Sequence, residues 1–121
     1  MMSVRAVRGA TTVDANTREE ILQATAELLK EIIEKNDISN DNAISMVFTL
    51  TNDLNAVFPA VAARELGFTD ISLMCMQEID VPGSLAQCIR IMVHFNTEKR
   101  NSELRHVYLK GAKVLRPDIS K

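Results

Sequence analysis

The chain has 121 residues, of which 46% are hydrophobic, and its 14 basic and 16 acidic residues give a formal net charge of −2. This length fits one domain over residues 1–121 and not two, and the charge lacks the basic excess that is typical of nucleic-acid-binding proteins. Because a domain this short buries only about two-thirds of its unfolded surface, association of subunits would supplement its core.

The N-terminus and the cysteines indicate a cytoplasmic protein. Residues 1–5 lack the apolar run of a signal peptide. The longest uncharged stretch near the middle of the chain, residues 56–63, is too short to span a bilayer, so we expect no membrane association. Cys75 and Cys88 could pair, but with no other sign of export we expect both to be reduced thiols.

The first two predicted elements are a strand over residues 4–12, which runs into a turn that contains Gly9, and a helix over residues 17–35. Thr17 and Glu20 have the form of a capping box, with a hydroxyl at the N-cap and a carboxylate three residues later. The helix is amphipathic and should pack on a sheet, because charged residues cover one side and the other side carries an apolar stripe of Ile21, Leu22, Leu28, Leu29, Ile32 and Ile33.

Short apolar or alternating runs predict the remaining strands. They are expected at residues 43–50, 71–76 and 87–95, with a last one in two parts, 104–109 and 112–116, joined by a bend or bulge at Lys110 and Gly111. The clearest of them is 87–95, in which one face should carry Ile89, Ile91, Val93 and Phe95 and the other Cys88, Arg90, Met92 and His94.

Polar segments at residues 36–42, 51–53 and 80–84 separate these elements, and Pro59 is well placed to begin a short helix that ends at Gly67. Runs of strands with few crossover helices favour an α+β fold over a doubly wound one. We therefore predict a mixed sheet of about five strands, packed by one long amphipathic helix and short helices. The pattern does not give the strand order.

Arg90 is the residue that fits least well with a simple structural role. It lies in the middle of the most apolar strand, between Ile89 and Ile91, where a charged group has to be paired. Its partner could be a structural carboxylate, or its planar guanidinium could face a carboxylate ligand. Glu78, after an apolar run, is a candidate partner for either Arg90 or Arg8.

Four other residues are candidates for binding, although each signal is weak alone. Arg8 is followed by the small residues of a strand end, and alternation leaves the hydroxyl of Tyr108 free to interact. Arg64 on the short helix and Arg116 before Pro117 are surface charges by default.

The sequence motifs for common catalytic sites exclude some functions but do not identify one. The chain shows no Ser-His-Asp arrangement and no glycine-rich phosphate loop. His94 and His106 are far apart and no ligand spacing is present, so we expect no metal. Eight of the 14 basic residues are arginine, which suits anion recognition and electrostatic stabilisation better than proton transfer.

Seven stretches together resemble the monofunctional chorismate mutases of the small trimeric α+β class, the type known from Bacillus. They occur in the family order and spacing and span nearly the whole chain, at residues 7–13, 56–60, 63–66, 75–78, 88–90, 105–109 and 114–118. The resemblance implies a homotrimer with a pseudo-α/β barrel at its centre and a cleft at each subunit boundary. It also implies an isomerase that converts the chorismate dianion to prephenate by an intramolecular Claisen rearrangement, in the route to phenylalanine and tyrosine, with no cofactor.

The resemblance further implies roles for individual residues. Arg90 would donate to the ether oxygen and help to hold a carboxylate, and Arg8 would hold the enolpyruvyl side of the substrate. Glu78 and Cys75 would meet the ring hydroxyl, and Tyr108 a carboxylate. The catalytic residues would thus be Arg90, Arg8 and Glu78, and the cleft would also be lined by Phe58, Ala60, Arg64, Met74 and Leu115, with Arg64 and Arg116 adding positive potential near its mouth.

The chain departs from the family pattern at three places. Met74 stands where the family often has threonine, Val61 replaces a lysine at the rim of the cleft, and the chain stops soon after residue 118. Two alternatives remain open: a non-catalytic trimeric module that binds a carboxylate metabolite, and an imine deaminase on a similar scaffold. The second does not account for the stretch 75–78.

Overall fold

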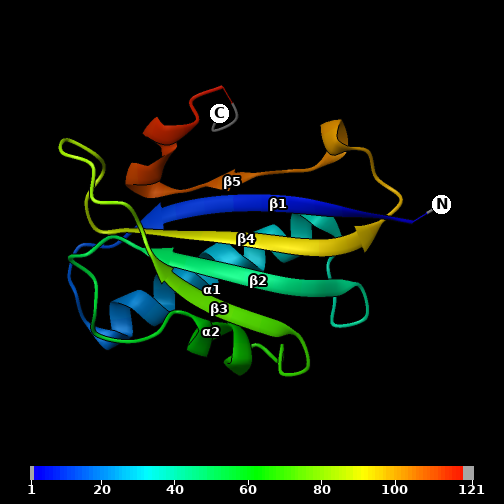
Figure 1. Cartoon of the computed structure of the whole chain (residues 1–121), viewed down its shortest axis with the longest axis horizontal. Helices are drawn as coiled ribbons and strands as arrows, with labels where there is room; N and C mark the ends of the chain where they lie inside the picture. The colour runs from blue at the N-terminus through cyan, green and yellow to red at the C-terminus, as the bar shows by residue number, and fades with distance from the viewer. Residues whose placement is uncertain (1, 119–121) are drawn as a thin grey trace.

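The computed structural model describes residues 2–118 and has a five-stranded mixed sheet with two helices on one face (Figure 1). The strand order is β3-β2-β4-β1-β5. β4 is antiparallel to both β1 and β2, whereas β3 is parallel to β2 and β5 is parallel to β1. The elements are β1 (Ser3–Thr12), α1 (Arg18–Asn36), β2 (Ala43–Leu50), α2 (Ala60–Glu65), β3 (Ser72–Gln77), β4 (Cys88–Thr97), β5 (Val107–Tyr108) and the 3-10 helices η1 (Asn101–Glu103) and η2 (Lys110–Leu115). The predicted α+β class and mixed sheet are confirmed.

Helix α1 begins and ends close to the predicted residues because its caps are strong. The Thr17 hydroxyl accepts a hydrogen bond from the backbone N–H of Glu20 at 3.2 Å. Glu20 does not close the capping box, since its carboxylate accepts from the backbone N–H of Asp14 instead. At the other end Asp37 adopts a left-handed conformation and its N–H bonds to the carbonyl of Ile33. No helix between residues 2 and 118 is long and apolar enough to cross a membrane.

Strand β4 carries the two faces that alternation predicts. Ile89, Ile91, Val93 and Phe95 are at most 1% exposed and pack against the helices. The short helix is also confirmed: Pro59 precedes α2, and Gly67 follows it with a φ of 103°.

Three further local predictions are wrong. Gly9 lies inside β1 and not in a turn; a Cβ there would collide with the carbonyl oxygen of Val107, so a glycine is what allows β5 to pair with β1. Residues 112–116 do not form a strand, because the chain turns at Lys110, whose φ is 51°, into the 3-10 helix η2. Within 104–109 only Val107–Tyr108 is a strand. Short apolar runs do not distinguish a strand from a helical turn.

The face of the sheet opposite the helices is largely uncovered in the single chain. η2 covers one edge of it, where Ala112 packs with Ala10, Cys88 and Tyr108. Elsewhere this open face carries Arg8 and Arg90 together with the exposed apolar side chains of Val4, Met74, Met76 and Met92.

Candidate active site

Arg90 and Glu78 form an ion pair on the open face. The Nε of Arg90 is 3.5 Å from Oε2 of Glu78, and the two side chains are 46% and 25% exposed. The same carboxylate oxygen accepts a short hydrogen bond from the hydroxyl of Thr49, which lies opposite Arg90 in the β2–β4 register. The backbone N–H of Glu78 donates to the carbonyl of Leu50 at 2.8 Å, which fixes the residue at the end of β3. The guanidinium is therefore held in place yet remains open to solvent.

The thiol of Cys88 lies beside Arg90, two residues away on the same face of β4. Burial raises the pKa of Cys88, and the charge of Arg90 only partly opposes that effect. A buried neutral thiol does not neutralise the guanidinium. Because a guanidinium has five N–H donors, its contacts with Glu78 and Cys88 leave donors for an anionic ligand.

Arg8, His106 and Arg116 form a second cluster of basic side chains. The backbone N–H of Arg8 donates to Nδ1 of His106 at 3.2 Å, so this ring nitrogen acts as an acceptor. Burial lowers the pKa of His106, and the charges of Arg8 and Arg116 lower it further. The histidine is therefore neutral near pH 7 and adds no third charge to this cluster.

Tyr108 is more buried than alternation suggests, with 8% of its surface exposed. It lies opposite Ala10 in the β1–β5 pair and packs with Leu115 of η2. Arg116 contacts the Tyr108 side chain and forms a bidentate pair with Asp118, at 3.2 and 3.0 Å. These contacts raise the pKa of Arg116, so its charge is permanent.

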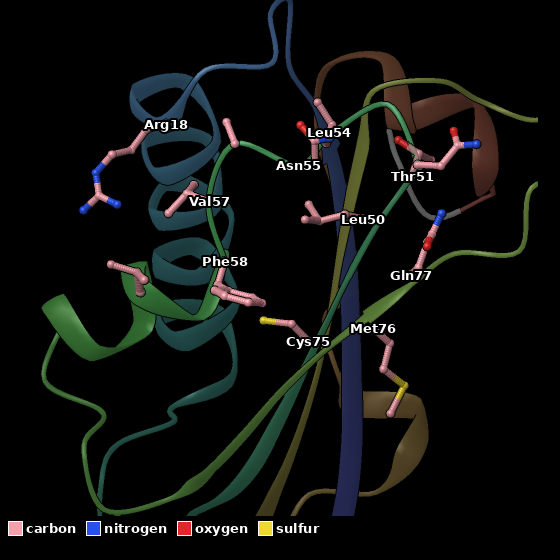
Figure 2. Close-up of a pocket in the computed structure, with 13 residues that line it drawn as sticks. Arg18, Leu50, Thr51, Leu54, Asn55, Val57, Phe58, Cys75, Met76 and Gln77 are labelled. Atoms are coloured by element: carbon pink, nitrogen blue, oxygen red, sulfur yellow. The ribbon is translucent and has the colours of Figure 1, made fainter.

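Two pockets contain predicted site residues. The first, of about 360 Å³, is lined by Glu78, Arg90 and Leu115 and by part of the 79–85 loop. The second, of about 720 Å³, lies between the loop before α2 and the end of β3, and in Figure 2 its Phe58 and Cys75 point toward one another. Thr51, which directly follows β2, lines both pockets.

Within one chain the predicted site residues divide into two groups. The arginine group comprises Arg8, Glu78, Arg90, Tyr108, Leu115 and Arg116, which lie along the open face and under η2. The edge group comprises Phe58, Ala60, Arg64, Met74 and Cys75, on α2, the loop before it and the edge strand β3. Phe58 is 71% exposed and Met74 is 56% exposed, whereas the side chain of Ala60 packs in the core. Arg64 is exposed on α2 and lines neither pocket.

Thr49 and His106 are the contributors that sequence reasoning misses. Thr49 reaches Glu78 because β2 and β3 are parallel neighbours, and His106 reaches Arg8 because β5 pairs with β1. Both contacts depend on strand order, and no sequence signal supplies it. Among residues 2–118 no three histidine, cysteine or acidic side chains lie close enough to hold a metal ion.

Comparison with known proteins finds chorismate mutases that match nearly the whole chain. Chorismate mutase AroH of Bacillus subtilis is 49% identical over 120 residues, which are 98% of this chain and 94% of that protein. Chorismate mutase AroH of Thermus thermophilus is 45% identical over 117 residues, which are 96% of each.

One solved structure is similar to this chain in both fold and sequence. The chorismate mutase from Clostridium thermocellum matches with a TM-score of 0.89 and 58% identity, and the match covers 91% of this chain and 98% of that one. The model of the family chorismate mutase type I matches residues 4–119. The chain therefore belongs to the chorismate mutase type I family.

Proposed function

We propose that the chain is an isomerase that converts chorismate to prephenate by an intramolecular Claisen rearrangement, in the route to phenylalanine and tyrosine. The observation that carries this proposal is the match, along nearly its whole length, with two relatives named chorismate mutase. The pericyclic step breaks a carbon–oxygen bond while a carbon–carbon bond forms within one molecule. The reaction requires the enzyme to bind the substrate, hold it in a folded conformation and stabilise the charge that develops on it.

Arg90 is the residue we assign to the breaking bond. Negative charge grows on the ether oxygen as this bond lengthens, and a fixed guanidinium donor stabilises that charge more than it stabilises the ground state. Glu78 and Thr49 support the role, because they hold the Arg90 side chain in one position before substrate arrives. A donor already in position needs little reorganisation during the reaction.

The other polar residues would orient the dianion. Arg8 would hold the enolpyruvyl side and Tyr108 a carboxylate, with Arg116 close enough to Tyr108 to strengthen that end of the site. Glu78 and Cys75 would meet the ring hydroxyl. Holding the side chain of the substrate folded over its ring contributes to the rate because the reacting carbons then start close together.

We infer that the complete site forms between subunits of a homotrimer with a barrel-like centre. The edge group and the arginine group occupy different parts of one chain, and the open face exposes Met74, Met76 and Met92. A second copy seated on this face would bury those side chains and bring its edge group, with Phe58, to the arginine group of its neighbour. Both cysteines are free, which supports a cytoplasmic enzyme.

The proposal is tested by adding the purified protein to chorismate, following the loss of its ultraviolet absorbance and identifying the product by NMR. We expect prephenate, with a rate that collapses in Arg90→Ala. Arg90→Lys keeps the charge but loses the planar fork, so we expect its kcat to fall about ten- to a hundredfold, the value of one charge-assisted hydrogen bond.

Arg100→Lys is the matched control, because Arg100 is an exposed arginine paired with Glu103 on η1. It should leave the rate unchanged. Near-normal turnover in Arg90→Lys would contradict the role of Arg90. Binding of chorismate without turnover would favour the non-catalytic module, and turnover of imino acids in its place would favour the deaminase.

A further inference from the structure

The larger pocket has a single charged residue in its lining. Its walls are apolar or neutral, formed by residues such as Leu50, Val57, Phe58 and Met76, and only Arg18 carries a charge among the described residues that line it. Figure 2 shows Arg18 at the start of α1, with its guanidinium directed away from Leu50, Thr51 and Cys75 and toward α2. Any positive potential that arises in this pocket itself therefore comes from one side chain.

Arg18 is exposed, and among residues 2–118 no partner neutralises it. No ion pair or hydrogen bond joins its guanidinium to another described residue. The nearby carboxylate of Glu20 instead accepts from the backbone N–H of Asp14. An unpaired guanidinium keeps its full capacity to attract an anion.

The position of Arg18 also argues against a structural role. It is the first residue of α1, where the unpaired backbone N–H groups already give the helix end a partial positive charge. Acidic residues are favourable there and a cation is unfavourable. Arg18 thus costs the helix some stability and makes no described contact that offsets the cost.

We propose that Arg18 is the residue that attracts the dianionic substrate into the larger pocket and selects for anions at its mouth. The inference rests on the proposed function and deepens it. The larger pocket contains Phe58 and Cys75 of the edge group, so in the proposed trimer it would open toward Arg90 of a neighbouring copy. Within one chain it shares only Thr51 with the cavity that Arg90 lines. Arg18 lies outside the reacting centre, so it acts equally on bound substrate and transition state, and its effect falls on KM and not on kcat.

The test compares chorismate kinetics of the unsubstituted protein with Arg18→Gln, Arg18→Glu and Lys30→Gln. We expect Arg18→Gln to raise KM about three- to tenfold with kcat unchanged, as suits one solvent-exposed charge, and Arg18→Glu to raise it further. Added salt should raise KM of the unsubstituted protein more than that of Arg18→Gln. Lys30→Gln removes the same charge from an exposed position further along α1, outside the pocket, and should leave KM unchanged.

Thermal unfolding separates this role from a structural one. Arg18→Glu should raise Tm, because it replaces a cation by an anion at the helix start, while it impairs KM. A KM within twofold of normal in both Arg18 variants, an effect on kcat alone, or a raised KM accompanied by a lowered Tm would each overturn the role of Arg18. Absence of chorismate turnover by the unsubstituted protein would instead overturn the proposed function.

Discussion

Arg90 does not supply the whole rate enhancement by itself. A charge-assisted hydrogen bond contributes about 1.5–3 kcal/mol, whereas a millionfold acceleration requires about 8 kcal/mol. The difference has to come from groups that hold the substrate folded. Under the proposed function those groups would be Arg8 and Arg116, together with Glu78, whose carboxylate pairs with Arg90.

His106 makes the stability of the protein depend on pH. Its pKa is lowered in the folded chain by burial and by Arg8 and Arg116, so the unfolded chain binds this proton more tightly. The stabilising contribution of the neutral ring is therefore present above its usual pKa of 6.5 and is lost as the pH falls below that value.

We expect His106→Gln to reduce the loss of Tm between pH 7.5 and pH 5, because glutamine does not titrate in that range and can still accept from the backbone N–H of Arg8. The measurement is thermal unfolding of both proteins at several pH values in one ionic strength. Parallel Tm curves for the two proteins would show that His106 is not responsible.

At the scale of elements, the shortest strand depends on one buried amide. Asn36 is fully buried at the end of α1, where its Nδ2 donates to the carbonyls of Ile32 and Arg105 and its Oδ1 accepts from the backbone N–H of Arg105. These bonds fix the segment that leads into β5, which has only two residues of its own. Tyr108 therefore depends on the last turn of α1.

We expect Asn36→Ala to lower the free energy of unfolding by about 1–3 kcal/mol, because it leaves the part-buried backbone N–H and carbonyl of Arg105 without their side-chain partner. Urea unfolding measures this change. Asn40→Ala, in the exposed loop after α1, is the control and should stay within about 0.5 kcal/mol of the unsubstituted protein. Equal midpoints for both variants would contradict the role of Asn36.

Local chemistry explains which elements were predictable from the sequence. α1 and β4 have a clear period and, for α1, a cap, so their bounds and faces were predicted nearly correctly. η2 was mistaken for a strand because its form depends on a turn at Lys110 and on packing under Tyr108. The Arg90–Glu78 pair was among the expected partners, whereas the contributions of Thr49 and His106 follow only from the strand order.

For the whole molecule, the open face of the sheet is the main feature that a single chain leaves unexplained. Apolar side chains on it, among them Met74 and Met92, are more than one-third exposed, although the opposite face is closely packed. Exposed apolar surface of this kind is typical of a protein–protein interface. A sheet that meets copies of itself would also explain why the site residues lie in two groups.

We expect the protein to have a mass of about 40 kDa in solution by light scattering, three times the 13.5 kDa of the chain. Met92→Asp, at the centre of the open face, should reduce the mass toward that of one chain and abolish turnover, because a buried unpaired charge opposes association. Asn40→Asp adds the same charge in an exposed loop and should leave mass and turnover unchanged. A fully active monomer would contradict the shared site.

Gly9 also has a consequence for how this protein can evolve. Every other amino acid would add a Cβ that collides with the Val107 carbonyl and crowds Leu28 and Ile32. Substitutions at position 9 are therefore not tolerated. The neighbouring residue, Arg8, projects from the opposite, uncrowded side of the same strand. New substrate preferences can arise by exchanging side chains on that side, so long as residue 9 itself stays without one.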